Sequence, residues 1–187
     1  SDEFQTLARI DFQSGARHSF FGRYLLTRFT QEPGYQGGDD NVLKTFAKGS
    51  NMSSHSTTSG ATTVFSASVV NSLRFAANIG RVDIFNTPFF DPPTLGIKMY
   101  SYNPGYMVVS VTPGFAILGA DQGKQLFFND TYQIGDDLTL VRGNHQFAVG
   151  GNLQYFKADY TSTSRTNGNW IFDGRATGLG LADLLVG

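Results

Sequence analysis

Hydrophobic and polar residues alternate almost without interruption between residues 142 and 160, RGNHQFAVGGNLQYFKADY. One parity carries His145, Phe147, Val149, Leu153 and Tyr155, and the other carries Gln146, Ala148, Gly150, Asn152 and Gln154. Successive side chains of a β-strand point to opposite sides of the sheet. A period of two over about ten residues therefore predicts a strand with one apolar and one polar face.

Two classes of protein use such strands. In a soluble β-sandwich the apolar face packs on a core and the polar face meets water. In an outer-membrane barrel the apolar face meets lipid, the polar face meets a wet lumen, and each strand needs about 9 to 11 residues to cross. The 142–160 pattern alone fits both classes.

The same period recurs along the chain and predicts further strands. Residues 71–81, NSLRFAANIGR, are two-faced, with Leu73, Phe75, Ala77 and Ile79 opposing Ser72, Arg74, Ala76 and Asn78. We expect other strands at 5–12, 18–29, near 56–65 and at 127–141, a short strand at 170–172, and a helical turn at 181–185.

The connections between these strands alternate in length. They run short, long, short, long, short, long, over residues 13–17, 30–55, 66–70, 83–125, 142–144 and 159–168. Five of the six prolines lie in the 83–125 connection, and proline cannot donate to a strand ladder, so we expect a long loop there. Outer-membrane barrels have short turns at one rim and long loops at the other, whereas sandwiches do not segregate their loops. The alternation therefore favours an all-β, antiparallel, up-and-down meander that forms part of a transmembrane β-barrel.

Composition narrows the function. Fourteen Lys and Arg against fifteen Asp and Glu give a net charge of -1, which offers no electrostatic reason to expect nucleic acid as a partner. The absence of Cys excludes disulfides, thiolate metal sites and a Cys nucleophile. No window of about 18 apolar residues predicts a transmembrane helix, and the mean hydropathy of -0.18 suits strands that show lipid only half of their residues. The first residues, SDEFQTLARI, do not have the pattern of a secretory signal peptide.

Four segments resemble consecutive blocks of a known barrel family. They are ARIDFQSGARHSFFGRYLLTRF, VFSASVVNSLRFAANIGR, YQIGDDLTLVRGNHQFAVGGNLQYF and NGNWIFDGRATGLGLADLLVG. In combination they look like the barrel of TonB-dependent outer-membrane receptors of the Oar-like group, whose members carry an N-terminal carboxypeptidase-regulatory-like domain. The resemblance spans nearly all of the chain, and its least matched parts are the Pro-rich connection and the Ser/Thr-rich stretch.

This resemblance implies a transporter of the outer membrane that captures an extracellular substrate and imports it with energy passed on by TonB. Neither a plug domain nor a final barrel strand is visible, and barrels of this family have about 22 strands. We therefore expect residues 1–187 to be a partial barrel, an internal portion of a longer receptor. The alternative is a soluble β-sandwich-like module that binds a carbohydrate or another ligand.

The sequence offers no clear catalytic or metal-binding constellation. His18, His55 and His145 do not share a ligand-spaced motif, and the pairs Asp39–Asp40 and Asp136–Asp137 do not follow the spacing of a calcium loop. No nucleophile elbow and no phosphate-binding loop is present. We therefore expect no enzymatic activity, no metal and no cofactor.

Binding residues are expected on the loops and on the polar strand faces. Tyr100, Tyr102 and Tyr106 are the candidates for substrate contact, because aromatic rings on a long loop stack on sugars, peptides or chelates. The predicted lumen-facing residues are Arg9, Arg23, Arg74, Asn78, Asn152 and Gln154. The predicted lipid-facing residues are Leu73, Phe75, Ile79, Phe147, Val149, Leu153 and Tyr155. The expected partners are outer-membrane lipid, an extracellular substrate, and TonB through a plug outside these residues.

Overall fold

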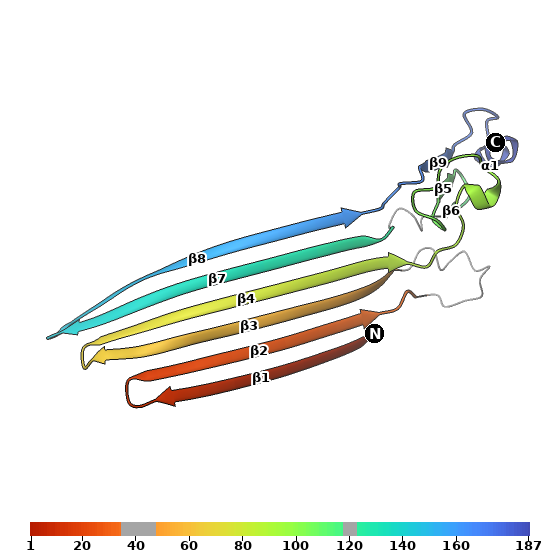
Figure 1. Ribbon diagram of the computed structural model, residues 1–187. Coiled ribbons are helices and arrows are strands. Elements are labelled where there is room, and N and C mark those ends of the chain that lie inside the picture. The colour runs from red at the N-terminus through yellow and green to blue at the C-terminus, as the bar shows by residue number, and fades with distance from the viewer. Residues whose placement is uncertain (35–47, 118–122) are drawn as a thin grey trace.

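Six long strands form one antiparallel sheet in the computed structural model, which describes residues 1–34, 48–117 and 123–187. The order across the sheet is β1-β2-β3-β4-β7-β8, so consecutive long strands are neighbours (Figure 1). Their bounds are Asp2–Ser14 (β1), His18–Gln31 (β2), Lys48–Ser66 (β3), Val69–Asn86 (β4), Gln125–Arg142 (β7) and His145–Ser162 (β8). The prediction of an all-β, up-and-down meander is confirmed.

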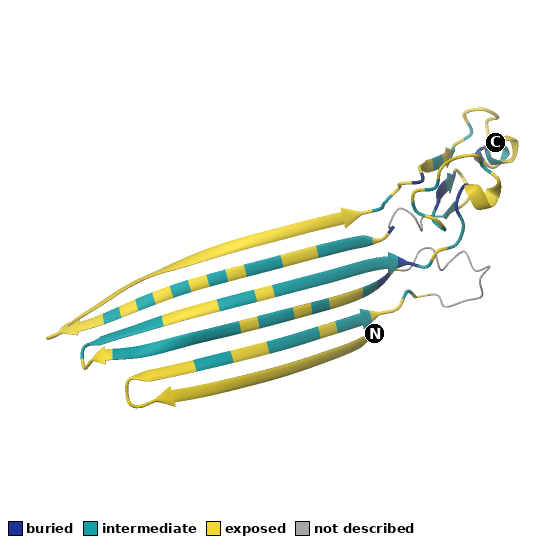
Figure 2. Ribbon diagram, in the orientation of Figure 1, coloured by how far each residue is buried: buried dark blue, intermediate teal, exposed yellow. Residues whose placement is uncertain are grey.

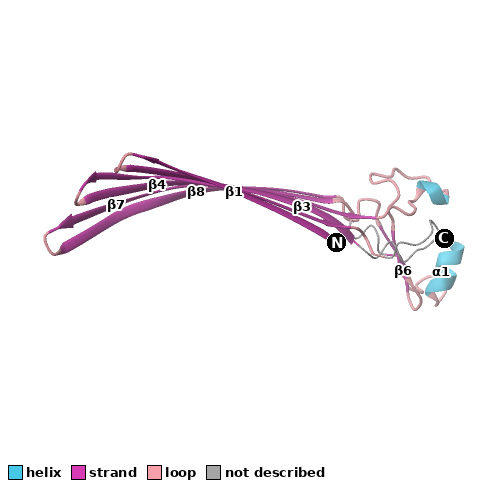
Figure 3. Cartoon of the chain, turned by 90° about the horizontal axis from the view of Figure 1, so that it is seen from below, coloured by secondary structure: helices cyan, strands magenta, loops and turns pink. Residues whose placement is uncertain are grey.

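The short turns lie at one end of this sheet, and the ends of β2, β4 and β8 from which the long connections leave lie at the other (Figures 1 and 3). The turns after β1 and β7 place Gly15 at φ 63° and Gly143 at φ 59°, a backbone conformation that favours glycine. The alternation of short and long connections predicted from the sequence is thus present in the fold.

The predicted loop boundaries were wrong by several residues. Residues 48–55, assigned to a loop, belong to β3, and β8 continues to Ser162, past the predicted loop start at 159. The 83–125 connection likewise begins only after β4 ends at Asn86. Asp39 and Asp40 lie outside the described residues. The strands are therefore longer, and the loops shorter, than the sequence pattern suggested.

The register separates the residues of the sheet onto two faces. One cross-strand row contains Ile10, Gly22, Ser59, Phe75, Ile134 and Leu153, and the row offset by one residue contains Arg9, Arg23, Thr58, Ala76, Gln133 and Gln154. We call the face with Phe75 and Leu153 the apolar face and the opposite face the polar face. Large apolar side chains are exposed on β1, β7 and β8, and no second sheet covers the apolar face within the described residues (Figure 2).

β3 is the exception on the apolar face. Between its neighbours β2 and β4 it presents Ser53, His55, Thr57, Ser59, Ala61 and Thr63 there. Of these six residues only Ala61 is apolar. His55 is within hydrogen-bond distance of its neighbour, with 2.6 Å between its Nδ1 and the Tyr24 hydroxyl. The apolar face thus carries a polar strand between two apolar ones.

A small module forms beyond the loop end of the sheet. Residues 87–117 and 163–187, which we call the loop module, contain η2 (Pro93–Leu95), β5 (Val108–Val111), β6 (Ala116–Ile117), β9 (Asn169–Phe172) and α1 (Gly180–Val186). β5 pairs antiparallel with β6 and parallel with β9. The short strand and the helical turn predicted near the C-terminus are confirmed, but residues 83–125 are not simply a loop, because they contain β5 and β6.

The hydrophobic core of the described residues lies in the loop module. Met107, Val109 and Val111 are buried there, and Phe90, Trp170 and Leu184 pack around them. Among the described residues no helix is long and apolar enough to cross a membrane.

Candidate functional site

The predicted lumen-facing residues lie together on the polar face. Arg9, Arg23 and Gln154 share one cross-strand row, Arg74 and Asn152 lie in the next row, and Asn78 lies in the row on the other side. All seven predicted lipid-facing residues lie on the apolar face. These six polar residues, from β1, β2, β4 and β8, therefore share one surface of the sheet.

Hydrogen bonds link neighbouring strands across this surface. Gln133 Nε2 donates to Gln154 Oε1 at 2.8 Å, and Ser56 Oγ donates to Asn78 Oδ1 at 2.5 Å. Arg74 forms an ion pair with Asp137. These pairs satisfy polar groups along the sheet and leave a wall that is suited to water or a polar ligand.

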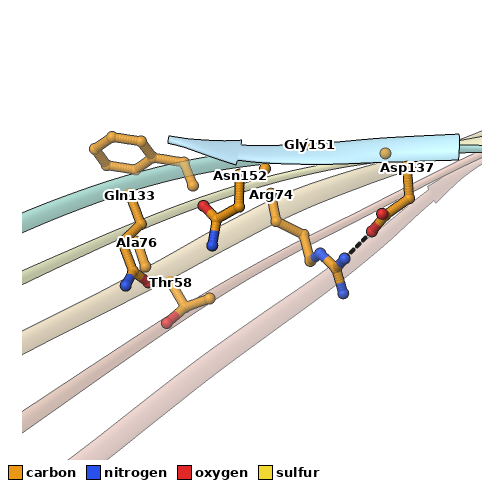
Figure 4. A pocket seen from close by; sticks show the side chains of 10 residues that line it. Thr58, Arg74, Ala76, Gln133, Asp137, Gly151 and Asn152 are labelled. Atoms are coloured by element: carbon orange, nitrogen blue, oxygen red, sulfur yellow. Dashed lines mark hydrogen bonds and ion pairs between the residues drawn. The ribbon is translucent and has the colours of Figure 1, made fainter. Parts of the chain in front are cut away.

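A shallow depression of about 470 Å³ lies around the Arg74–Asp137 pair (Figure 4). Gly150 forms part of its wall, and a Cβ there would collide with the Asp137 carboxylate. Glycine thus allows the carboxylate to lie against the β8 backbone and face Arg74. The depression therefore offers a polar site on the sheet, lined by charged and amide side chains.

The polarity of the two faces reverses near the loop end. On the apolar face, the two rows beyond Tyr132 and Tyr155 contain Arg28, Arg81, Asp130, Lys157 and Asp159, which we call the charged belt. The apolar residues of these rows are Phe4, Leu26, Ile79 and Phe128. Arg81 pairs with Asp130 at 2.5 Å, and Lys157 pairs with Asp159 at 3.0 Å. On the opposite face the row between Asp159 and Thr161 contains Phe29, Met52, Val82, Phe127 and Tyr160, with Glu3 at its β1 end, and the Phe127 and Tyr160 rings lie 4.6 Å apart.

The reversal sets the limits of the lipid-facing band. On β8 the apolar positions run from Phe147 to Tyr155, nine residues, which matches the 9 to 11 residues of a tilted membrane strand. The full strand has 18 residues and extends about 60 Å, which corresponds to about 45 Å along the membrane normal at a tilt of about 40°. The apolar band of a barrel is only about 25 Å tall, so the strands project beyond it on the side of the charged belt.

The three candidate tyrosines differ in their surroundings. Tyr100 and Tyr102 are 80% and 61% exposed, so their rings are free to contact a ligand. Tyr106 is half-buried, and its hydroxyl donates to the carbonyl oxygen of Asn86 at 2.7 Å. Burial raises the pKa of the Tyr106 phenol above its ordinary value. Tyr106 thus anchors the loop module to the end of β4, a role that its position in the sequence does not indicate.

Two buried polar side chains shape the segment that carries these tyrosines. Asn167 Nδ2 donates to the carbonyl oxygens of Asn103 and Tyr106, each at 2.7 Å. Asp91 accepts bonds from the Gly105 backbone N–H at 3.1 Å and from Ser101 Oγ at 2.9 Å. Burial opposes ionisation of Asp91, but these hydrogen bonds outweigh it and hold the Asp91 pKa below its ordinary value. The sequence pattern did not mark the bonds of Asp91 to Ser101 and Gly105 or those of Asn167, because they span 10 or more residues of the chain. Asp91 also has a local partner, since its Oδ1 accepts a bond from the Thr94 backbone N–H at 3.2 Å.

The described histidines and the pair Asp136–Asp137 each lie beside other kinds of side chain. His18 lies near Thr63, with 3.2 Å between Nδ1 and Oγ1, and the His145 ring lies 6.3 Å from the Phe147 ring. Asp136 accepts a bond from Asn71 Nδ2 at 2.7 Å, and it lies on the face opposite Asp137. Within the described ranges no group of three or more His, Cys, Asp or Glu residues is placed to hold a metal ion.

The assignment of the two faces can be tested with single cysteines, because residues 1–187 contain none. We expect nitroxide labels on Leu73→Cys and Val149→Cys to relax with oxygen, which concentrates in lipid. Labels on Arg74→Cys and Asn152→Cys should relax with a water-soluble nickel chelate instead. Electron paramagnetic resonance on the protein in outer-membrane vesicles measures both. Equal access of the nickel chelate to all four positions would contradict the assignment.

Comparison with known proteins gives one result that covers the whole chain. The family described as "Outer membrane beta barrel domain" matches residues 1–187. No curated protein and no solved structure matches the chain. The family match and the two-faced sheet agree, and they place the protein in the outer membrane rather than among soluble β-sandwich binding modules. The chain belongs to the outer-membrane β-barrel domain family.

Proposed function

We propose that this protein is part of a TonB-dependent receptor, which binds an extracellular substrate and imports it across the outer membrane. The observation that carries the proposal is the position of the loop module. It stands beyond the charged belt, at the end of the sheet where all the long connections gather, while the opposite end has only tight turns. Such an asymmetry suits capture of a substrate on the loop side, since binding residues concentrate on loops held by a rigid scaffold.

The open sheet supports a larger barrel. Within the described residues β1 pairs only with β2, and β8 pairs only with β7. An unpaired strand edge in lipid leaves backbone N–H and C=O groups without partners, which costs several kcal/mol for each group. We infer that further strands pair with both edges and close the barrel. The polar face would then line the lumen, with Arg9, Arg23, Arg74, Asn78, Asn152 and Gln154 along the passage.

A plug domain would lie against the polar face and connect the barrel to TonB. Outer-membrane lipid would cover the apolar face up to the charged belt. The protein would act as a transporter without catalytic activity, cofactor or nucleic-acid partner. Of the three candidate tyrosines, Tyr100 and Tyr102 would meet a substrate first, because they are more exposed than Tyr106.

Uptake can be tested by a comparison of culture media, which requires no assumption about the substrate. We expect cells that lack the full-length protein to leave in their medium at least one compound that complemented cells remove. Mass spectrometry of spent medium from the two strains identifies it, and cells without TonB should show the same defect. Identical media from the two strains would reject the transport proposal. If cells without TonB still remove the compound from the medium, only the dependence of transport on TonB is rejected.

A further inference from the structure

An apolar cleft of about 420 Å³ opens in the loop module. Leu95 of η2, Phe115 beside β6, Trp170 and Phe172 of β9, and Leu184 of α1 form much of its wall. The buried side chains of Met107 and Val109 form its base. Both segments of the loop module, residues 87–117 and 163–187, therefore contribute to the cleft. The pairing of β5 with β9 brings these two segments together.

The lining side chains carry no charge and no unused hydrogen-bonding group. Their only polar atom suited to a strong hydrogen bond is Trp170 Nε1, which donates to the Asn167 carbonyl oxygen at 3.3 Å. Four aromatic rings, those of Phe90, Phe115, Trp170 and Phe172, lie in the wall. A ligand would be recognised here by its shape, by loss of apolar surface from water and by ring contacts.

The cleft is open rather than a sealed core. Leu95 and Phe115 are 54% and 46% exposed. The loop module lies past the charged belt, so the lipid that covers the apolar face does not reach the cleft. Binding sites for small ligands have volumes of about 300 to 1,000 Å³ and mostly apolar walls. An occupant must arrive through water and be small enough to enter a cleft of this size.

We propose that this cleft binds an uncharged aromatic group of the extracellular substrate. That the ligand is the imported substrate rests on the proposed function. Binding of an uncharged aromatic group by the cleft does not, because binding requires no transport. The aromatic wall offers edge-to-face and offset ring contacts. A charged group would lose its hydration and find no partner in the cleft.

Binding is tested on the full-length protein in outer-membrane vesicles with 4-bromobenzyl alcohol as the probe. Trp170 is the only Trp in residues 1–187, and bromine in contact with an indole ring quenches its fluorescence. The fluorescence of Trp170 is obtained as the difference in emission between vesicles with the native protein and vesicles with Trp170→Phe. We expect saturable quenching by the neutral alcohol and at least about tenfold weaker binding of the charged analogue 4-bromobenzoate. Quenching that never saturates, or equal quenching by both compounds, would overturn the proposal.

A charge at the rim provides the matched test. Leu95→Arg changes an exposed residue of the cleft, and Leu185→Arg changes a residue of α1 that is 79% exposed and does not line the cleft. Leu95→Arg should weaken binding of the alcohol about tenfold and strengthen binding of the benzoate, while Leu185→Arg should change neither. Unchanged binding in Leu95→Arg, with an unchanged Trp170 emission maximum as evidence of folding, would also overturn the proposal. If the protein binds the alcohol but cells that lack the protein show no uptake defect, transport is rejected and binding of aromatic groups by the cleft still stands.

Discussion

Removing residues 88–113 from the full-length protein is expected to abolish substrate uptake while the barrel stays inserted in the outer membrane. The segment contains η2 and β5, and its loss removes the central strand of the loop-module sheet together with Tyr100 and Tyr102. It contributes no strand to the six-stranded sheet, because β4 ends at Asn86 and its neighbour β7 begins at Gln125. Uptake of the compound identified in spent medium measures the first effect, and heat-modifiable migration of the barrel measures the second.

Replacement of the same segment by a Gly/Ser linker of equal length is the control. The linker keeps the reach between β4 and β7 but cannot form β5. It should therefore abolish uptake as the deletion does. Normal uptake in either variant would reject the assignment of this segment to substrate capture.

Gly180→Val is expected to unfold the loop module and leave the six-stranded sheet intact. A Cβ at Gly180 would collide with the carbonyl oxygens of Phe172 and Thr112 and would lie 3.0 Å from the Thr112 backbone nitrogen. These are backbone atoms at the ends of β9 and β5, so they cannot rotate away as a side chain would. The helix α1 must therefore move off the sheet, at a cost of about 3 kcal/mol or more.

Limited proteolysis of intact cells measures this effect. We expect cleavage within residues 87–117 and 163–187 to be at least about tenfold faster in Gly180→Val than in the native protein, as a loss of about 1.4 kcal/mol already shifts a folding equilibrium tenfold. Leu181→Val is the matched control, because Leu181 is an exposed neighbour on the same helix. Equal protease resistance of the native protein and Gly180→Val would show that the close approach at Gly180 is not required.

The strand faces were predictable from the sequence because the side-chain period is local. Leu73 and Val149 lie on the apolar face, and Arg74 and Asn152 on the polar face, as alternation alone predicted. The start of β3 was not predictable in this way. Residues 48–55 are rich in Ser and have little contrast between their two faces, so no period marks them. They are strand because β4 pairs with all of them and β2 pairs with those from Ser50 onward.

The loop module was less accessible to sequence reasoning for a different reason. β5 and β9 pair in parallel although about 60 residues of chain separate them, and no local signal encodes a contact of that range. The prolines correctly excluded a central strand of the large sheet, yet β5 forms between Pro104 and Pro113. The cleft beside Trp170 follows from this pairing, and the anchoring role of Tyr106 follows from its contact with Asn86, 20 residues away, so neither had a signature in the sequence.

The polar outer surface of β3 has a consequence for the membrane itself. Acyl chains beside β2 and β4 meet Phe20, Tyr24, Leu73 and Phe75, but those beside β3 meet hydroxyl groups over most of the same height. A bilayer adapts to a short hydrophobic surface by thinning, at a fraction of a kcal/mol for each ångström. We therefore expect the lipid annulus next to β3 to be thinner and its acyl chains less ordered than elsewhere around the barrel. The protein would then impose a fixed lateral asymmetry on the leaflet that surrounds it.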